Sequence, residues 1–445
     1  MSPTRVFPLA VLMLAGSAMA QPAAMLALPE PAVALSIDGE LTLVSLATAQ
    51  APDSGPLGLR FRWGRGQAPA DAAKVAEFPA LVPGTRGVAM SDDATAIVVR
   101  VGTSISLSRP GSSLPLGSSL TTDIAGLNAD GSIIAGSTDQ SGEPRGFVRA
   151  AGASLGPTAL LPLAGDDESL VNAISGDGLV CVGVSDTGPR NRAAAVSWLG
   201  PFVPGMSIVP SVVPGLQPGV DSEALGVSPD GSTIVGRIGV DAGPGTQTTA
   251  FIWNASAGTT LITTPCGGSA GRAIAVDASL GGRVVVGTAW CGPTGQAQAL
   301  IWTRRTGALP LAQMLANGGG PNFANEDLGE AVAVSGDGLT IAGRTTSTLG
   351  GPAQGWVAHI PRLLTCSPAD VADTDGLTGF DGGGPDGSVD NGDFQAFFSA
   401  FFLPDDAMAR PAADVANTDS DPTPDGSIDN GDFQAFFVAF FSPCD

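Results

Sequence analysis

The C-terminal 80 residues contain two copies of one acidic pattern whose spacing suits cation binding. "DGSVDNGDFQAFFSAFF" runs from Asp386 to Phe402, and "DGSIDNGDFQAFFVAFF" runs from Asp425 to Phe441. Calcium takes six to eight oxygens, which a short loop supplies from alternate positions around a glycine at its sharp turn. Each copy matches the second half of such a loop, so the sequence predicts one calcium site per copy.

The candidate ligands of the second half-loops stand at loop positions five, seven, nine and twelve. They are Asp386, Ser388, Asp390 and Asp393 in the first copy, and Asp425, Ser427, Asp429 and Asp432 in the second. Position seven is expected to bind through its backbone carbonyl. The upstream stretches "ADVADTD" and "ADVANTD" add Asp370, Asp373, Asp375, Asp414, Asn417 and Asp419. These stretches lie further away than a standard loop allows, so the choice among the upstream residues stays open.

A phenylalanine stripe follows each acidic loop. Five Phe in each copy fall at i, i+3, i+4, i+7 and i+8, which predicts a short amphipathic helix. Pro404 and Pro443 are expected to end the two helices. Ten Phe exceed what one small helix–helix contact needs, so we expect part of the stripe to bind a partner: Phe394, Phe397, Phe398, Phe401, Phe433, Phe436, Phe437 and Phe440. The alternative is a calcium module without a partner, in which the helices only pack on each other.

The distribution of charge separates this tail from the rest of the chain. The 445 residues carry a net charge of −22, and the tail from Cys366 onward has sixteen Asp against one Arg. A phosphate backbone would be repelled, so nucleic acid is excluded as a partner. We expect a separate module over 365–445.

The first twenty residues have the pattern of an export signal. Arg5 precedes an apolar run that ends at "SAMA", and we expect cleavage after Ala20. The run is too short for a permanent anchor, and no later segment is long and apolar enough to span a membrane. The mature protein is therefore expected to be secreted, either extracellular or at the cell surface.

The five cysteines suit an oxidising compartment in part. Cys366 and Cys444 are expected to clasp the two ends of the tail. Cys266 and Cys291 could form a second bridge. Cys181, in the apolar run "GLVCVGV", is expected to be a buried free thiol.

Before the tail, one pattern recurs seven times. Its copies are "ALSIDGELTLVSL", "GVAMSDDATAIVVR", "IAGLNADGSIIAGS", "NAISGDGLVCVGV", "ALGVSPDGSTIVGR", "AIAVDASLGGRVVVGT" and "AVAVSGDGLTIAGR". Each copy reads as two strands joined by a tight turn, because Asp-Gly between apolar runs favours a hairpin. A second element, such as "AFIW" or "ALIW", follows each copy and predicts a third strand; a fourth strand follows it.

Four strands per unit, repeated seven times, predict an all-β fold, a seven-bladed β-propeller over 21–364. We expect the strand-like segment "AAMLALPEP" to complete the last blade and close the ring. A β-solenoid or a pair of sandwiches is the alternative architecture.

The ring contains little that suggests catalysis. The single histidine, His359, is expected to be structural, and "GGSAG" at 267–271 lacks the strand–turn–helix context of a nucleophile elbow. The turn aspartates Asp130, Asp177, Asp230 and Asp337 are expected to be hairpin residues tens of ångströms apart. We expect no catalytic residue. The alternative is a secreted propeller enzyme, a hydrolase or lyase acting on polysaccharide.

Two resemblances follow from these motifs. The duplicated loop–helix tail resembles a dockerin, in particular the C-terminal anchor of secreted planctomycete-type proteins, and the seven units resemble secreted "extracellular repeat" propellers. The dockerin resemblance implies a small α module of two loop–helix repeats, calcium as cofactor, and a cohesin-like or cell-surface partner protein. The repeat resemblance implies a propeller and no particular activity.

Overall fold

A computed structural model gives the fold. It describes residues 24–28, 32–35, 41–44, 58–60 and 73–75, then most of 85–360, and finally 389, 391–402, 415 and 428–441. The gaps within 85–360 are 94, 110, 119–121, 141–142, 153–155, 187–192, 217–218, 240–247, 265–271, 292–295, 305, 318–327, 337 and 346–354. The expected export signal at 1–20 lies outside the described residues.

Each blade begins with a hairpin whose turn has a repeated set of hydrogen bonds. In "SPDGST" the N–H of Thr233 donates to the Oγ of the buried Ser228 at 3.0 Å, and that hydroxyl donates to Asp230. Gly231 follows with φ of 71°, a left-handed conformation that strains any other residue. The serine-to-amide bond recurs at Ser91, Ser175, Ser279 and Ser335, and Asn128 takes the same place in another blade. The recurring residues therefore form a turn in which the buried serine hydroxyl and the backbone N–H are hydrogen-bonded to each other.

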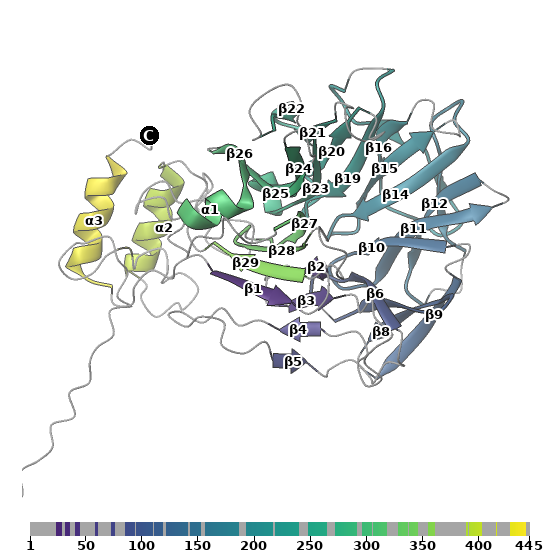
Figure 1. Cartoon of the computed structure of the whole chain (residues 1–445), viewed down its shortest axis with the longest axis horizontal. Coiled ribbons are helices and arrows are strands. Elements are labelled where there is room, and N and C mark those ends of the chain that lie inside the picture. Colours follow the sequence, from purple (N-terminus) through teal and green to yellow (C-terminus); the bar gives the residue numbers. More distant parts are fainter. Residues whose placement is uncertain are drawn as a thin grey trace, which may run out of the picture.

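The described strands build a mainly-β propeller (Figure 1). Six blades have described side chains. The first three are β6 (Thr85–Met90), β7 (Ile97–Val101), β8 (Ser104–Arg109) and β9 (Ser112–Ser118); then β10 (Thr122–Leu127), β11 (Ile133–Gln140), β12 (Glu143–Ala150) and β13 (Thr158–Leu160); then β14 (Glu168–Ile174), β15 (Val180–Asp186), β16 (Ala194–Leu199) and β18 (Ser211–Val212).

The other three blades follow along the chain. They are β19 (Ser222–Val227), β20 (Thr233–Ile238), β21 (Thr249–Asn254) and β22 (Gly258–Ile262); then β23 (Arg272–Ala278), β24 (Val284–Cys291), β25 (Gln296–Thr303) and β26 (Gly307–Pro310); then β27 (Glu330–Val334), β28 (Thr340–Arg344) and β29 (Gly355–His359) with β1 (Ala24–Leu28). The predicted hairpins and third strands occupy the predicted segments in all six.

Strand β1 joins the two ends of the propeller sequence. It pairs antiparallel with β29, from Ala24 opposite His359 to Leu28 opposite Gly355, and so supplies the outer strand of that blade. The predicted closure by the N-terminal strand is therefore confirmed. This pairing covers an edge of β29 that would otherwise present unpaired backbone groups.

A further four-stranded sheet is described by its backbone. It contains β2 (Ala32–Leu35), β3 (Leu41–Val44), β4 (Gly58–Arg60) and β5 (Ala73–Val75), in that order. Its first strand, β2, contacts β27 on one side and β6 on the other. The first repeat copy therefore forms a blade-like sheet between the last blade and the β6 blade.

Three short elements were not anticipated from the sequence. Strand β17 (Ser207–Ile208) pairs parallel with β13, so the segment after β16 also extends the sheet of the preceding blade. A short helix, α1 (Leu311–Asn317), follows β26 and contacts β25 and β26; it buries Leu311, Met314 and Leu315 in a cluster shared by that blade and the last blade. A 3-10 turn, η1 (Leu280–Gly282), forms the hairpin turn of the β23 blade. The apolar i, i+3, i+4 spacing in "LAQMLAN" accounts for α1.

The core lies between neighbouring blades. Trp198, Phe251 and Trp356 are fully buried, each in an apolar cluster that includes residues of an adjacent blade. Cys181 is buried and free, as predicted, and burial raises the pKa of its thiol. Cys291 is disulfide-bonded; Cys266, Cys366 and Cys444 lie outside the described residues.

The described residues of the C-terminal region form two short helices, α2 (Asn391–Phe402) and α3 (Asn430–Phe440). They lie side by side (Figure 1, yellow-green and yellow) and share one apolar cluster. Each helix begins three residues before its first Phe, and each is followed by the predicted proline. The two predicted helices are therefore present, and most of the loop residues before them lie outside the described residues.

Candidate functional site

The phenylalanines of α2 and α3 form one aromatic cluster. Phe397 and Phe436 are fully buried, and their rings stack with centroids 3.9 Å apart and an interplanar angle of 11°. Phe394 and Phe398 lie beside this pair, and each contacts the ring of Phe437 edge to face. The stacked pair holds the two helices together, so Phe397 and Phe436 cannot reach a partner while the helices stay packed.

Apolar side chains at the C-terminal ends of the helices are open to solvent. Phe402 is 67% exposed, Val438 73% and Phe441 77%. Phe402 and Phe441 occupy the same position of the two copies, one residue beyond the last Phe in the predicted contact set. The exposed part of the stripe is therefore displaced toward the helix ends. Phe394, Phe398, Phe401, Phe433, Phe437 and Phe440 are half-buried.

The acids at the start of α3 have defined hydrogen bonds. Asp429 is the N-cap: its Oδ1 accepts from the N–H of Gly431 at 2.7 Å, and the Oδ2 of Asp432 accepts from the N–H of Asp429 at 2.9 Å. This reciprocal pair is a capping box, with negative charge at the positive end of the helix dipole. Two residues predicted to bind calcium thus also fix the start of the helix.

A contact from further upstream meets the same helix start. The second carboxylate oxygen of the buried Asp432, Oδ1, accepts from the N–H of Val415 at 2.8 Å. Val415 belongs to "ADVANTD", the stretch that carries the predicted first-half ligands. The chain between the helices therefore returns to the beginning of α3.

The corresponding acid of the first copy, Asp393, is also buried, in the first turn of α2. The other predicted ligands lie outside the described residues: Asp370, Asp373, Asp375, Asp386, Ser388, Asp390, Asp414, Asn417, Asp419, Asp425 and Ser427. Among the described residues no group of three or more acidic, His or Cys side chains could hold a metal ion. Asp393, Asp429 and Asp432 are thus the part of the predicted ligand set that the structure places.

Within the propeller, the hairpin turns of successive blades meet. The N–H of Asp93 donates to Ala129, that of Ala129 to Gly176, and that of Asp177 to Pro229. The Oδ2 of Asp230 accepts from Gly281 of the next blade at 3.1 Å. The expectation that these turns lie tens of ångströms apart is therefore wrong for neighbours, because inner-strand turns converge in a ring. Their predicted role as turn residues is confirmed for Asp130, Asp177 and Asp230; Asp337 lies outside the described residues.

Two acids of this region were not predicted. Asp277 on β23 is partly buried; its Oδ2 accepts from Val334 of the next blade and its Oδ1 from Ala278, both at 2.9 Å. Burial raises the pKa of Asp277 to about 7, despite these bonds. Asp92, in the turn after β6, has its pKa raised to about 6, by burial and by the neighbouring charge of Asp93. The two carboxyl groups are close enough for the charge on Asp92 to raise the pKa of Asp277 as well.

The repeats contain a signal for both acids. Asp277 stands two residues before the turn serine, where the other five blades have Ala89, Gly126, Ala173, Gly226 and Ala333. Asp92 stands directly after its turn serine, where the next blades have Ala129, Gly176 and Pro229. A carboxylate at a position that otherwise holds a small or apolar residue marks a local departure from the blade pattern.

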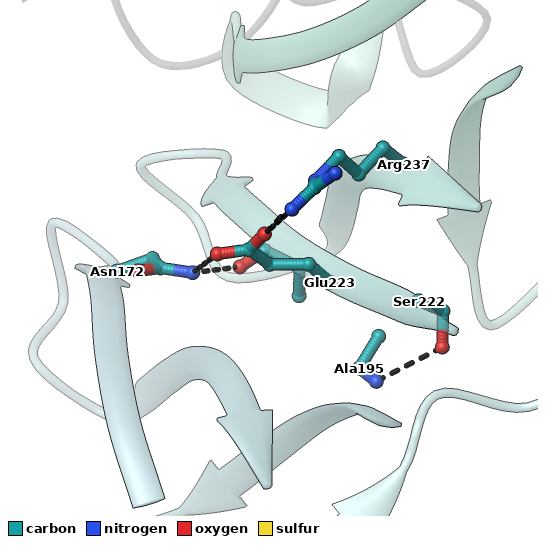
Figure 2. Close-up of polar contacts among 6 residues, drawn as sticks. Asn172, Ala195, Ser222, Glu223 and Arg237 are labelled. Atoms are coloured by element: carbon teal, nitrogen blue, oxygen red, sulfur yellow. Dashed lines mark hydrogen bonds and ion pairs between the residues drawn. The ribbon is translucent and has the colours of Figure 1, made fainter. Parts of the chain in front are cut away.

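Hydrogen bonds connect two neighbouring blades beside an ion pair that lies within one of them (Figure 2). Glu223 on β19 accepts from Nε and Nη2 of Arg237 at 2.9 and 2.7 Å. Asn172 on β14 donates to the Oε1 of Glu223 at 3.1 Å and to the carbonyl of Ala224 at 2.8 Å. Ser222 on the same strand accepts from the N–H of Ala195 at 3.0 Å. These bonds are structural links between blades.

The lone histidine has a partner within its own blade. The Nδ1 of His359 lies 3.1 Å from the Oγ1 of Thr340 on the paired strand. The structural role predicted for His359 agrees with this contact. The stretch "GGSAG" at 267–271 lies outside the described residues. None of the helices in the described part of the chain is long and apolar enough to cross a membrane.

Comparison with known proteins assigns the chain to no family. No known family profile and no curated protein matches the chain. Among solved structures, TolB from Acinetobacter baumannii is 13% identical with a TM-score of 0.37, over 59% of this chain and 60% of that one. The β-propeller domain of the Trilobed protease from Pyrococcus furiosus is 9% identical with a TM-score of 0.36, over 76% and 83%.

Prolyl oligopeptidase B from Galerina marginata is 11% identical with a TM-score of 0.42, over 75% of this chain and 48% of that one. The chain thus spans less than two thirds of the length of this protein and of the Acinetobacter TolB. The propeller assignment rests on the strand order of the chain itself, and no dockerin module is identified by similarity.

Proposed function

We propose that this chain is an exported, non-enzymatic seven-bladed propeller that attaches to a cell-surface or extracellular partner through a calcium-dependent, dockerin-like C-terminal module. The β2–β5 sheet would be the seventh blade, since β2 contacts both β27 and β6. The observation that carries the proposal is the duplicated helix start. Two acid-rich half-loops, which differ only at Val389 and Ile428, each lead into a Phe-striped helix, and the helices pack as a pair.

The contact between Val415 and Asp432 supports the calcium part of the proposal. Val415 of "ADVANTD" contacts the start of α3, and it is the neighbour in sequence of Asp414, one of the predicted upstream ligands. A carboxylate oxygen can accept a hydrogen bond and still bind a cation through its other lone pair. Calcium at this point would bring upstream and downstream acids together and neutralise their mutual repulsion.

The exposed residues at the helix ends support the docking part of the proposal. Phe402, Val438 and Phe441 remain open although the other aromatic rings pack. We infer that a cohesin-like or cell-surface protein contacts this end of the helix pair. The same arrangement without a partner would be a structural calcium module.

The test of docking compares calcium with chelator. The tagged full chain is incubated with a cell-surface fraction of the producing organism, and the bound protein is measured in calcium and in EDTA. We expect the chain to be retained in calcium and released in EDTA. The double variant Phe402→Ser, Phe441→Ser should abolish this retention, whereas the control Leu261→Ser, on the propeller, should not. Retention in EDTA would contradict the mechanism.

The second candidate is a secreted propeller enzyme acting on polysaccharide, and the acidic pair Asp92 and Asp277 is the observation in its favour. Carboxyl groups with pKa values near 6 and 7 could exchange protons near neutral pH. Both oxygens of Asp277, however, accept backbone hydrogen bonds, and the one from Val334 joins two blades. Turnover of a polysaccharide that Asp92→Asn abolishes without unfolding the chain would favour the enzyme; equal activity of that variant would exclude this pair.

A further inference from the structure

One arginine of the propeller lacks the ion pair that its counterparts form. Arg100, Arg237 and Arg344 each stand nine residues after a turn serine, at the same place of three blades. Arg237 pairs with Glu223 and Arg344 with Glu330, directly across the hairpin in each case. The residue across from Arg100 is Arg86, which offers no carboxylate.

The neighbouring blade has the acidic residue of this pair but lacks the arginine. Asp123 on β10 occupies the position of Glu223 and Glu330, five residues before the turn residue Asn128. The residue across from Asp123 is Ser137, which carries no charge. One blade therefore has an arginine without its acid, and the next blade has an acid without its arginine.

These two side chains line the same cavity. It has a volume of about 380 Å³ and lies between β7, β10, β11 and β14, with Arg100 and Asp123 in its wall. Arg100 is half-buried and Asp123 exposed, and neither forms an ion pair or side-chain hydrogen bond with a described residue. The two opposite charges thus face the same cavity and lie more than 4 Å apart, which is beyond the distance of an ion pair.

The rest of the wall is partly apolar. Val88, Ile105, Ile124 and Leu170 come from three blades, and the hydroxyls of Thr122 and Thr138 add polar edges. The hydroxyl oxygen of Ser137, which also lines the cavity, accepts a hydrogen bond from the N–H of Val171 at 2.9 Å. The cavity therefore combines one cationic group, Arg100, with two carboxylates, Asp123 and Asp139, and an aliphatic surface, on a framework held by hydrogen bonds between blades.

We propose that this cavity binds a small amphipathic zwitterion, an α-amino acid with an aliphatic side chain, either free or as a dipeptide. The guanidinium of Arg100 receives the carboxylate, because its planar donors match the two oxygens. Asp123 receives the ammonium group, and the aliphatic wall receives the side chain. The volume is at the small end of the usual range for ligand pockets, which suits a ligand of this size.

The experiment is equilibrium dialysis of the full chain with radiolabelled L-leucine, in EDTA so that the calcium module does not contribute. We expect saturable binding. Unlabelled leucine competes, whereas leucinamide, which lacks the carboxylate, and N-acetyl-leucine, which lacks the ammonium, compete at least about tenfold less well. Stronger competition by leucyl-leucine than by leucine identifies the dipeptide as the source, and the reverse identifies the free amino acid.

Matched variants assign the site. Arg100→Gln and Asp123→Asn each weaken leucine binding at least about tenfold, whereas Arg344→Gln, at the equivalent position of another blade, leaves it unchanged. Thermal unfolding of each variant shows that the chain is folded. A dissociation constant weaker than about 1 mM for every probe, or equal competition by N-acetyl-leucine and leucine, would overturn the proposal. So would an equal loss of binding in Arg344→Gln.

Discussion

At the scale of single residues, the turn serines explain why the repeat letters recur. Each serine hydroxyl accepts a hydrogen bond from a backbone N–H, and the hydroxyl of Ser228 also donates one to the turn aspartate, Asp230. A buried donor that loses its acceptor costs about 1–3 kcal/mol. The recurring serine is therefore a structural requirement of the hairpin rather than a mark of catalysis.

Replacing Ser228 by alanine tests this requirement. The variant leaves the N–H of Thr233 without its side-chain acceptor, and we expect a loss of about 1–3 kcal/mol in the free energy of unfolding. Urea denaturation of the full chain measures the loss. Ser232→Ala is the control, because that hydroxyl bonds Asp230 at an exposed site and should cost clearly less. Equal losses in the two variants would refute the role assigned to the buried serine.

Asp92 provides a prediction for pH dependence. Its pKa of about 6 in the folded protein lies above the ordinary value of 3.8, so the folded state holds the proton more tightly than the unfolded state. Its contribution to stability therefore falls as pH rises from about 4 to about 6, and the full cost of the buried charge is present above that. Asp92→Asn removes this cost.

We therefore expect Asp92→Asn to raise the free energy of unfolding above that of the wild type. This gain should be about 1–2 kcal/mol larger at pH 8 than at pH 4, a figure that allows for the partial exposure of Asp92. Urea denaturation of both proteins at the two pH values gives the difference. The same variant should lower the pKa of Asp277, since the charge of Asp92 raises it. A difference between the proteins that does not change with pH would contradict the assigned burial.

At the scale of elements, the two C-terminal helices depend on their stacked rings. Phe397 and Phe436 are fully buried, whereas Phe402 and Phe441 are largely exposed. Large-to-small substitution of a buried Phe costs about 3–5 kcal/mol. A helix pair this short has no other apolar cluster among the described residues with which to compensate.

Phe397→Ala should therefore release α2 and α3 while leaving the propeller folded. We expect amide hydrogen exchange in both helices to accelerate by at least about a hundredfold, with exchange in the strands unchanged. Phe402→Ala is the matched control and should leave the exchange of both helices within about twofold of wild type, because its ring is exposed. Protected helices in Phe397→Ala would show that something other than the stacked pair holds them.

The elements were largely predictable from the sequence because the signal is local. An Asp-Gly turn between apolar runs specifies a hairpin wherever it occurs, and the Phe stripe specifies a helix. The closure by β1 was predictable because the last unit lacks a fourth strand. The convergence of neighbouring turns was not, because repeat spacing gives distance along the chain but not the tilt that brings inner-strand turns together.

The candidate sites were less predictable. The acids of the C-terminal loops could be found from their spacing, but burial of Phe397 and Phe436 depends on how the helices pair, which the stripe alone does not give. Asp277 and the separated charges of Arg100 and Asp123 appear only when the blades are superimposed and their exceptions are compared. Their chemistry arises from contacts between blades, which no single repeat contains.

At the scale of the whole molecule, the propeller and the C-terminal helices have different chemistry. In the described part of the propeller, hydrogen bonds join neighbouring blades, and ion pairs link residues within a single blade. The C-terminal 80 residues carry a net charge of −15 with few basic residues to balance it. Such a charge density opposes compaction unless a cation neutralises it. We therefore propose that calcium binds the C-terminal module and is required for its function.

Isothermal titration of calcium into the full chain tests this claim most directly, with a chain ending at residue 364 as the control. We expect two calcium ions per full chain and none for the control. Asp393→Asn and Asp432→Asn should each remove one of the two sites. Equal calcium binding by the full chain and the control, or no binding by either, would contradict the account.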